Sequence, residues 1–150
     1  MDFVELFGVF MPGEVGISLV LEIAVAVLLA LALFMAATHR GTYHHWIMLS
    51  AFLVDELIAK PIMVQRFTLG VFGDFPYSST SGLVHISLSI ITTVSGIIAI
   101  YLGFRYRVKK DGKMFMPPRG RIHKIFGAVF YASWYLAFLL GMRVFLMFYV

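Results

Sequence analysis

The 150-residue sequence contains no cysteine. That absence excludes disulfides, iron–sulfur clusters, thiolate zinc sites and thiolate-ligated haem. Any bound metal must therefore take its ligands from His, Met, Asp, Glu or Tyr. Gly-rich phosphate loops, nucleophile triads and nucleic-acid-binding motifs are also lacking, so we expect no nucleic-acid partner. No internal repeat is evident, and the length predicts a single domain over residues 1–150.

Charged residues are scarce, at 13% of the chain, whereas 61% of the residues are hydrophobic. A soluble domain is about 45–50% apolar and about 25% charged, so the composition predicts an integral membrane protein. The first residues, MDFVELFGVFMPGE, are acidic. A cleavable signal peptide begins with a basic region, so we expect none here and predict a short interfacial segment instead.

Four long apolar stretches predict transmembrane helices, because about 20 such residues cross the hydrocarbon core. Backbone groups in lipid are satisfied only in helices or closed barrels, and runs this long and uniform favour helices. Short connections make successive helices antiparallel. We therefore predict an all-α membrane protein, an up-down-up-down bundle of four transmembrane helices, with Pro61 kinking the second. The predicted spans are Val15–Ala37, Tyr43–Phe67, Ser81–Phe104 and Ile122–Tyr149.

Basic residues indicate the orientation, because cytoplasmic loops carry an excess of Lys and Arg. They gather in the first and third connections, at Arg40, Arg105, Arg107, Lys109, Lys110, Lys113, Arg119, Arg121 and Lys124. Acidic residues gather on the other side, at Asp2, Glu5, Glu14 and Asp74. The pattern predicts a multi-pass protein of the cell membrane with both termini on the non-cytoplasmic side. The basic third connection is also suited to contact with lipid headgroups.

Two histidines are candidate ligands of one cofactor. His44 and His123 each begin a helix that rises from the cytoplasmic side, so they lie at similar depth. The second and fourth helices are diagonal partners in an up-down bundle. The pair can therefore ligate the iron of a haem b from opposite faces. For His39 and His45, which lie at the same side, a role as polar residues at a helix end is favoured instead.

Other residues near these histidines fit the same site. Met48, one helical turn beyond His44, is a substitute haem ligand or a soft ligand for Cu(I), although methionine more often fills a core. Arg40, Arg121 and Lys124 lie at the water boundary, where they can pair with haem propionates.

A second polar cluster is expected deeper in the membrane. Glu56 and Lys60 have the spacing and order of a helical ion pair. Glu22 on the first helix is level with Lys60 by the helical rise, and Asp55 lies near the middle of its span. We predict a buried polar network of Glu22, Asp55, Glu56 and Lys60. A structural salt bridge and a proton or metal role remain open for it.

His85 has no histidine diagonally opposite, so a second bis-histidine haem is not expected. With Glu56 or Glu22, it is a candidate to bind a metal, a quinol or a proton. A set of His85, Glu56 and Glu22 would suit copper or iron.

Three motifs together resemble a known family. They are His44-x-x-x-Met48, the string LVHISLSIITTVSGIIAIYLGF with His85, and RIHKIFGAVFYASWYLAFLLG with His123. The pattern resembles a family of small four-helix membrane proteins of unknown function that includes the CtaM-type factors for maturation of haem–copper oxidases. The resemblance covers the second to fourth helices, and it implies a respiratory-chain setting with haem or copper handling at His44, Met48, His85 and His123. His39 and the Asp55-Glu56 pair are not part of the family pattern.

Three functional hypotheses follow. The leading one is a haem-b protein, with haem between His44 and His123, that serves electron transfer or terminal-oxidase maturation and is not an enzyme on its own. The second is a cofactor-free accessory subunit that docks other membrane subunits of a respiratory complex through its aromatic fourth helix. The third is a copper or iron site of His and carboxylate.

Overall fold

The computed structural model describes residues 3–6, 9–62, 64, 80–110, 112–115 and 120–149, and this part of the chain is predominantly helical. The all-helical class predicted from composition is confirmed. The helices are α1 (Gly13–Ala37), α2 (Gly41–Val54), the π-helix η1 (Asp55–Ala59), α4 (Thr80–Tyr106) and α5 (Arg121–Tyr149). Three segments are long and apolar enough to cross a membrane, namely Val15–Ala37, Gly82–Tyr106 and Arg121–Arg143.

The second predicted span differs from the other three. Its described part runs without a break from α2 through η1 to Ile62 and carries Asp55, Glu56 and Lys60. Residues 63 and 65–67, at the end of the predicted span, lie outside the described residues, whereas residue 64 is helical. Arg119, in the third connection, also lies outside the described residues.

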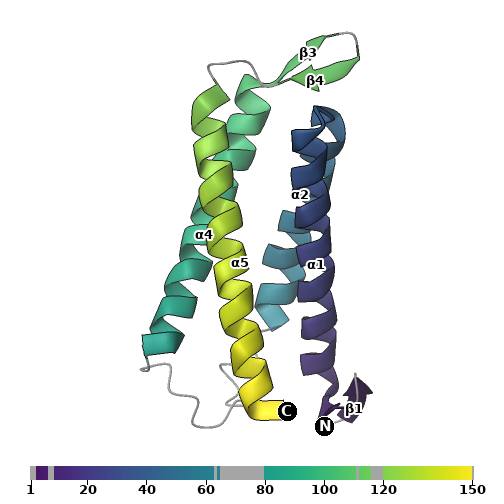
Figure 1. Cartoon of the computed structure of the whole chain (residues 1–150), viewed down its shortest axis with the longest axis vertical. Helices are drawn as coiled ribbons and strands as arrows, with labels where there is room; N and C mark the ends of the chain where they lie inside the picture. Colours follow the sequence, from purple (N-terminus) through teal and green to yellow (C-terminus); the bar gives the residue numbers. More distant parts are fainter. Residues whose placement is uncertain are drawn as a thin grey trace.

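The helices form two antiparallel hairpins that stand side by side (Figure 1). One hairpin joins α1 to α2, and the other pairs α4 with α5. Between the hairpins, α1 contacts α5 and α2 contacts α4. The helices α2 and α5 are therefore diagonal. The end of α1, the start of α2, the end of α4 and the start of α5 meet at one end of the bundle, opposite the two termini (Figure 1).

A cluster of buried side chains joins the hairpins near the middle of the bundle. Phe130 of α5 is 1% exposed and packs with residues of α1 and α2. Two tyrosines of α5 donate to backbone carbonyls of α1, Tyr131 to Leu29 (3.2 Å) and Tyr135 to Ala26 (2.9 Å). Membrane helices associate through close packing and interhelical hydrogen bonds of this kind. The cluster comprises Val25, Leu29, Ala32, Met48, Ala51, Phe52, Phe130 and Trp134.

Two short strand pairs lie outside the helices. β1 (Phe3–Leu6) pairs with β2 (Val9–Pro12), where the sequence predicts only an interfacial segment. β3 (Val108–Lys110) pairs with β4 (Lys113–Phe115) in the basic connection. The Asp-Gly dipeptide at 111–112 is a strong hairpin signal in the sequence, because such turns require a positive φ. In the structure, Gly112 adopts a φ of +74° in the turn.

The helices α4 and α5 also contain a repeat, contrary to the expectation of none. Seven residues of α4 recur at a constant offset in the segment that starts at Gly120 and continues through α5. Because the two helices are antiparallel, the two copies have inverted topology. Gly82, His85, Ser95, Ala99, Leu102, Gly103 and Arg105 recur as Gly120, His123, Ser133, Ala137, Leu140, Gly141 and Arg143. The matching residues are separated by positions of varying identity, so the repeat is weak in the sequence and becomes clear once the contacts of the two histidines are compared.

Candidate functional site

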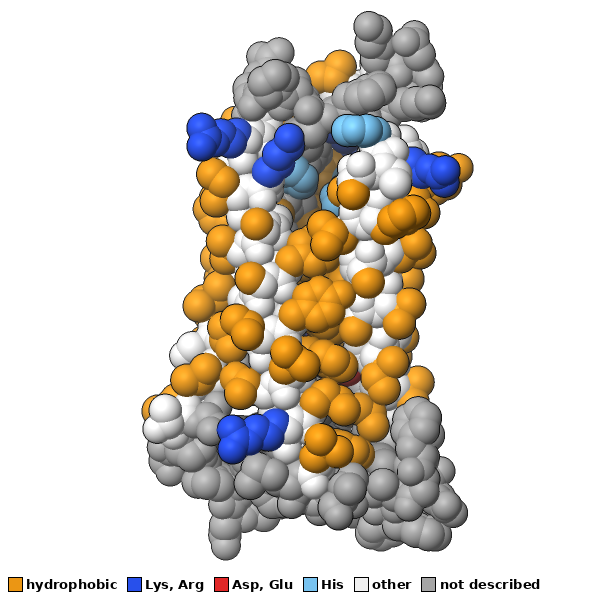
Figure 2. Space-filling view, in the orientation of Figure 1, with side chains coloured by type: hydrophobic (Ala, Val, Ile, Leu, Met, Phe, Trp, Pro, Cys, Tyr) orange, Lys and Arg blue, Asp and Glu red, His pale blue; other side chains and the backbone are white. Residues whose placement is uncertain are grey.

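A pocket of about 110 Å³ opens between the hairpins at the basic end of the bundle. It is bordered by α2, α4 and α5, so residues from the diagonal helices face one another across it. Histidine side chains are visible there between the hairpins, beside Lys and Arg side chains (Figure 2). Its lining residues include His44 and Met48 of α2, Gly103 and Arg107 from the end of α4, and His123 of α5.

The two predicted ligand histidines share this pocket, and both rings are held in the same way. His44 Nδ1 lies 2.9 Å from the Ala32 carbonyl of α1, and His123 Nδ1 lies 2.8 Å from the Ala99 carbonyl of α4. A carbonyl oxygen only accepts, so each Nδ1 must carry the proton. In the neutral ring the lone pair is then on Nε2. Metal-ligating histidines typically donate their second ring N–H to a backbone carbonyl or a carboxylate in this manner.

Glycines determine the space around His123. A Cβ at Gly103 would lie 3.3 Å from His123 Cε1, so the imidazole rests on the glycine backbone of α4. Gly127, one turn beyond His123, also lines the pocket. A Cβ there would meet nothing within 4 Å. Open space therefore lies beside Gly127 on α5.

The other predicted ligand, Met48, also lines the pocket. Its side chain is 9% exposed, and its Sδ lies 2.9 Å from Tyr131 Oη, whose single proton is shared between this sulfur and the Leu29 carbonyl. The thioether therefore lies in the same pocket as His44 and His123, where the sequence predicts a soft ligand.

A cationic contact crosses the rim of the pocket and was not expected from the sequence. Arg107 Nη1, just after α4, donates to His45 Nε2 on α2 (2.9 Å). The guanidinium lies 4.4 Å from the centre of the Phe104 ring, and the His45 ring meets Phe104 edge-on. Arg107 thereby places a positive charge at the pocket itself and links the two hairpins. The place of Arg107 in a run of basic residues does not predict this contact with His45.

The cations predicted to pair with propionates are arranged differently. Arg40, Arg121 and Lys124 are exposed at the same end of the bundle, and none of them lines the pocket. His39 is also exposed and adopts a φ of 57°, the left-handed conformation that ends many helices. It does not line the pocket, in keeping with the expectation of a polar helix end.

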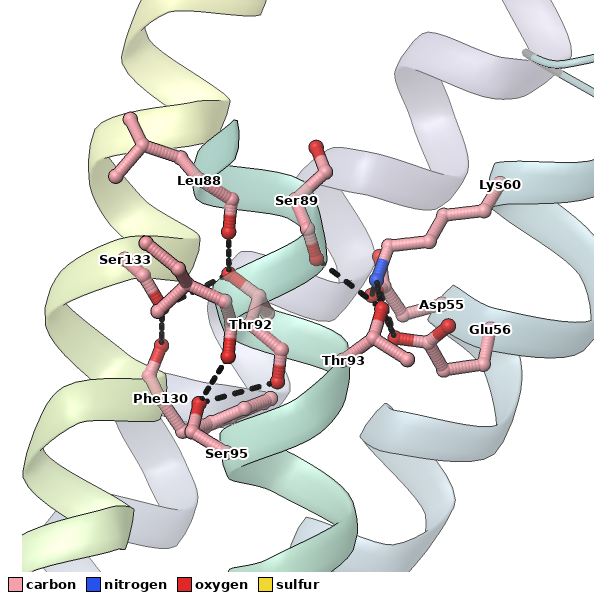
Figure 3. A network of polar contacts seen from close by, with 11 residues as sticks. Asp55, Glu56, Lys60, Leu88, Ser89, Thr92, Thr93, Ser95, Phe130 and Ser133 are labelled. Carbon is pink, nitrogen blue, oxygen red and sulfur yellow. Dashed lines mark hydrogen bonds and ion pairs between the residues drawn. The ribbon is translucent and has the colours of Figure 1, made fainter. Parts of the chain in front are cut away.

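The predicted polar network lies deeper in the bundle, around the π turn (Figure 3). Lys60 Nζ donates to Glu56 Oε1 and to Thr93 Oγ1 (2.9 Å), and it lies 3.1 Å from Asp55 Oδ2. Thr93 in turn donates to Glu56 (2.9 Å). Glu22 of α1 is close enough to Asp55 and Lys60 to interact electrostatically with both. All the predicted members of the network therefore lie together.

The π turn itself has a local cause. Pro61 has no N–H, and its ring would crowd the carbonyl of Leu57 in a regular helix. The turn before it is widened, and the Lys60 N–H bonds the Asp55 carbonyl five residues back. Widened turns of this type are frequent at functional sites. A kink at Pro61 was expected, whereas the π turn lies directly before it and carries the two acidic side chains.

His85 occupies the counterpart of the His123 position at the other end of the α4–α5 pair. Its Nδ1 lies 3.1 Å from the Ala137 carbonyl, and a Cβ at Gly141 would lie 3.5 Å from its Cε1. Among the residues that the structure describes, no three His, Asp or Glu side chains form a group that could hold a metal ion. The set of His85, Glu56 and Glu22 is thus not assembled here, and its metal role stays a prediction.

Comparisons with known proteins place no constraint on these assignments. No family model matches the chain, and neither a curated protein nor a solved structure matches it significantly.

Proposed function

We propose that the chain is a membrane protein that binds one haem b, which His44 and His123 would hold through their Nε2 atoms. The observation that carries this proposal is that both imidazole rings lie at one pocket and have the same protonated ring nitrogen. They line one pocket from diagonal helices, and each donates Nδ1–H to a backbone carbonyl, at 2.9 Å and 2.8 Å. Both Nε2 atoms are then suited to bind iron.

The residues around His44 and His123 have the chemistry to bind a porphyrin, but the pocket between them is small. Gly127 provides open space beside His123, and Arg107 supplies a cation at the pocket. Pockets for ligands of drug size enclose about 300–1,000 Å³, whereas this one encloses about 110 Å³. Haem entry therefore requires the hairpins to separate at this end. The helices contact one another mainly within each hairpin, which favours such a movement.

A copper ion is the second candidate, and the small volume favours it. His44, His123 and the Met48 thioether lie in one pocket, and imidazole with thioether is a donor set suited to Cu(I). Copper would occupy the pocket without separation of the hairpins.

The proposed setting is the cell membrane, with four spans and both termini on the non-cytoplasmic side. Three helices have the length and composition to cross. The α2–η1 segment is proposed as the fourth because it runs alongside them and faces its charges inward to the network. Arg40, Arg105 and Lys124 are exposed at the pocket end, which favours that end as cytoplasmic.

The proposed role is electron transfer, or maturation of a terminal oxidase, within a respiratory assembly. Support comes from the resemblance of the His44–Met48, His85 and His123 motifs to the CtaM-type family. The fourth helix, rich in Phe, Tyr and Trp, is proposed to contact other membrane subunits.

The deciding experiment is expression with added haem precursor and copper, followed by purification in mild detergent and measurement of haem and copper per chain. We expect one haem and a sharp low-spin b-type change in the visible spectrum on reduction by dithionite. Copper without haem would replace the first candidate with the second. Protein with neither group, co-purifying with a larger complex, would overturn both and favour a cofactor-free accessory subunit.

A further inference from the structure

The polar network around η1 lies at mid-depth in the bundle. Thr93 is the central residue of α4, and it accepts a hydrogen bond from Lys60 and donates one to Glu56. A charged side chain at the centre of a transmembrane helix costs about 2.5–3.5 kcal/mol on insertion scales. Ionised groups at this depth therefore need close partners of opposite charge.

The network holds more acids than cations. Glu22, Asp55 and Glu56 are its carboxyl groups, and Lys60 is its ammonium. The remaining charged residues of the described helices lie near helix ends, and α4 and α5 present Ser, Thr and aromatic side chains at this level. Full ionisation would leave two negative charges uncompensated inside the bundle.

The Lys60 ammonium has no capacity for all three acids. An ammonium has three N–H donors. Two donate to Glu56 and Thr93, and Asp55 Oδ2 lies 3.1 Å from the same nitrogen. Glu56 is the best compensated acid, because Thr93 also donates to it (2.9 Å). The third N–H is available to Asp55, so none is left for Glu22, which interacts with the neighbouring Asp55 where α1 contacts η1, and two anions there would repel.

Incompletely satisfied polar atoms mark the same place. Asp55 is 1% exposed, and its Oδ2 has an ion-pair contact with Lys60 at 3.1 Å but no well-directed hydrogen bond from the described residues. On the α1 face that carries Glu22, Ser18 is 2% exposed, and its Oγ has no partner in the described part of the chain. A buried acceptor without a donor is costly, and a proton on a carboxyl group converts an acceptor into a donor.

We propose that Glu22 and Asp55 form a proton-binding site in the middle of the membrane, in which at least one exchangeable proton is held at neutral pH. Glu56 and Lys60 form the fixed ion pair beside it. The Trp134 indole, which is 3% exposed and interacts with Asp55, closes the site from α5. The proposal does not depend on what the pocket at the basic end binds.

The test is infrared spectroscopy of the purified full-length protein in a detergent without ester groups. A protonated carboxyl group has a C=O stretching band separate from the carboxylate bands, and exchange into D₂O shifts it. We expect this band in the wild type at neutral pH. Glu22→Gln or Asp55→Asn should weaken or remove it, and Glu56→Gln, the matched control, should leave it in place.

Each variant replaces a carboxyl group by an amide of nearly the same shape, and circular dichroism shows whether the helices remain. Folded wild type without the band would overturn the proposal, as would a band that survives the double variant Glu22→Gln/Asp55→Asn. Loss of the band in Glu56→Gln alone would also overturn it. The protein for this test is prepared without added haem precursor or copper, so that no haem propionate contributes to the band and failure here is distinguishable from failure of the proposed cofactor.

Discussion

Individual side chains make the basic end of the bundle suited to ligand binding. The backbone carbonyls of Ala32 and Ala99 fix the Nδ1 protons of His44 and His123. Ring orientation is thereby set before any ligand arrives, which lowers the cost of binding. The similar depth of His44 and His123 on diagonal helices could be predicted from the sequence. The carbonyl partners were not, because they depend on how closely the neighbouring helices approach.

Gly127 offers a test of the pocket that spares both histidines. A Cβ at this position meets nothing within 4 Å, and leucine has a higher helix propensity than glycine, so Gly127→Leu should not lower the free energy of unfolding. Its side chain would occupy the space beside His123, and haem content per chain should fall to a small fraction of the wild-type value. Gly127→Ala, which adds one methyl group, is the control for a glycine effect on α5. Unchanged haem content in the leucine variant would place the porphyrin elsewhere.

Gly96 tests the packing between the hairpins. A Cβ there would lie 2.5 Å from Phe52 Cε2 and 2.9 Å from Phe130 Cδ2, inside van der Waals distance of two buried rings. Gly96→Ala should therefore destabilise the protein by about 1–3 kcal/mol. Chemical unfolding in detergent measures the change. A neutral result would mean that the rings move at no cost and that the core is looser than described.

At the scale of elements, length and hydropathy were enough to find the helices but not their irregularities. The predicted Val15–Ala37 falls within α1, and the predicted third span differs from α4 by one or two residues at each end. The π turn was missed because Pro61 acts on the turn before it. The inverted repeat in α4 and α5 was missed because its matching residues show their common role only through contacts.

The repeat predicts that its two histidines contribute equally to helix pairing. His85 donates to Ala137 and rests on Gly141, as His123 donates to Ala99 and rests on Gly103. Interhelical hydrogen bonds in membranes average about 0.6 kcal/mol and reach about 1.7 kcal/mol. In protein prepared without cofactor, His85→Ala and His123→Ala should each cost an amount in that range. Unfolding measurements that find a cost for one variant alone would show that the copies have diverged in function.

For the whole molecule, charged and apolar side chains are separated along the bundle. Exposed cations surround the pocket end, and apolar side chains cover the middle (Figure 2). The distribution of Lys and Arg predicts this from the sequence alone, since most of these residues fall in two connections. The shape of the pocket could not be predicted, because it depends on how two hairpins that pack mainly within themselves meet.

The absence of cysteine makes the orientation directly testable. Lys109 in β3 and Thr80 at the start of α4 are both exposed and lie at opposite ends of the bundle. A membrane-impermeant maleimide should label Thr80→Cys in intact cells, and it should label Lys109→Cys only after permeabilisation. The unmodified chain is the blank. The reverse labelling pattern would show that the protein has the opposite orientation in the membrane. Labelling of both cysteines in intact cells would contradict a membrane-spanning bundle.

The central claim is that His44 and His123 together hold one haem, and the most direct measurement is a reduced-minus-oxidised visible spectrum of single histidine variants. We predict a low-spin b-type spectrum for the wild type and for His85→Ala, and its loss in both His44→Ala and His123→Ala, with all four proteins inserted in the membrane at similar levels. A low-spin spectrum retained in both His44→Ala and His123→Ala would contradict the account.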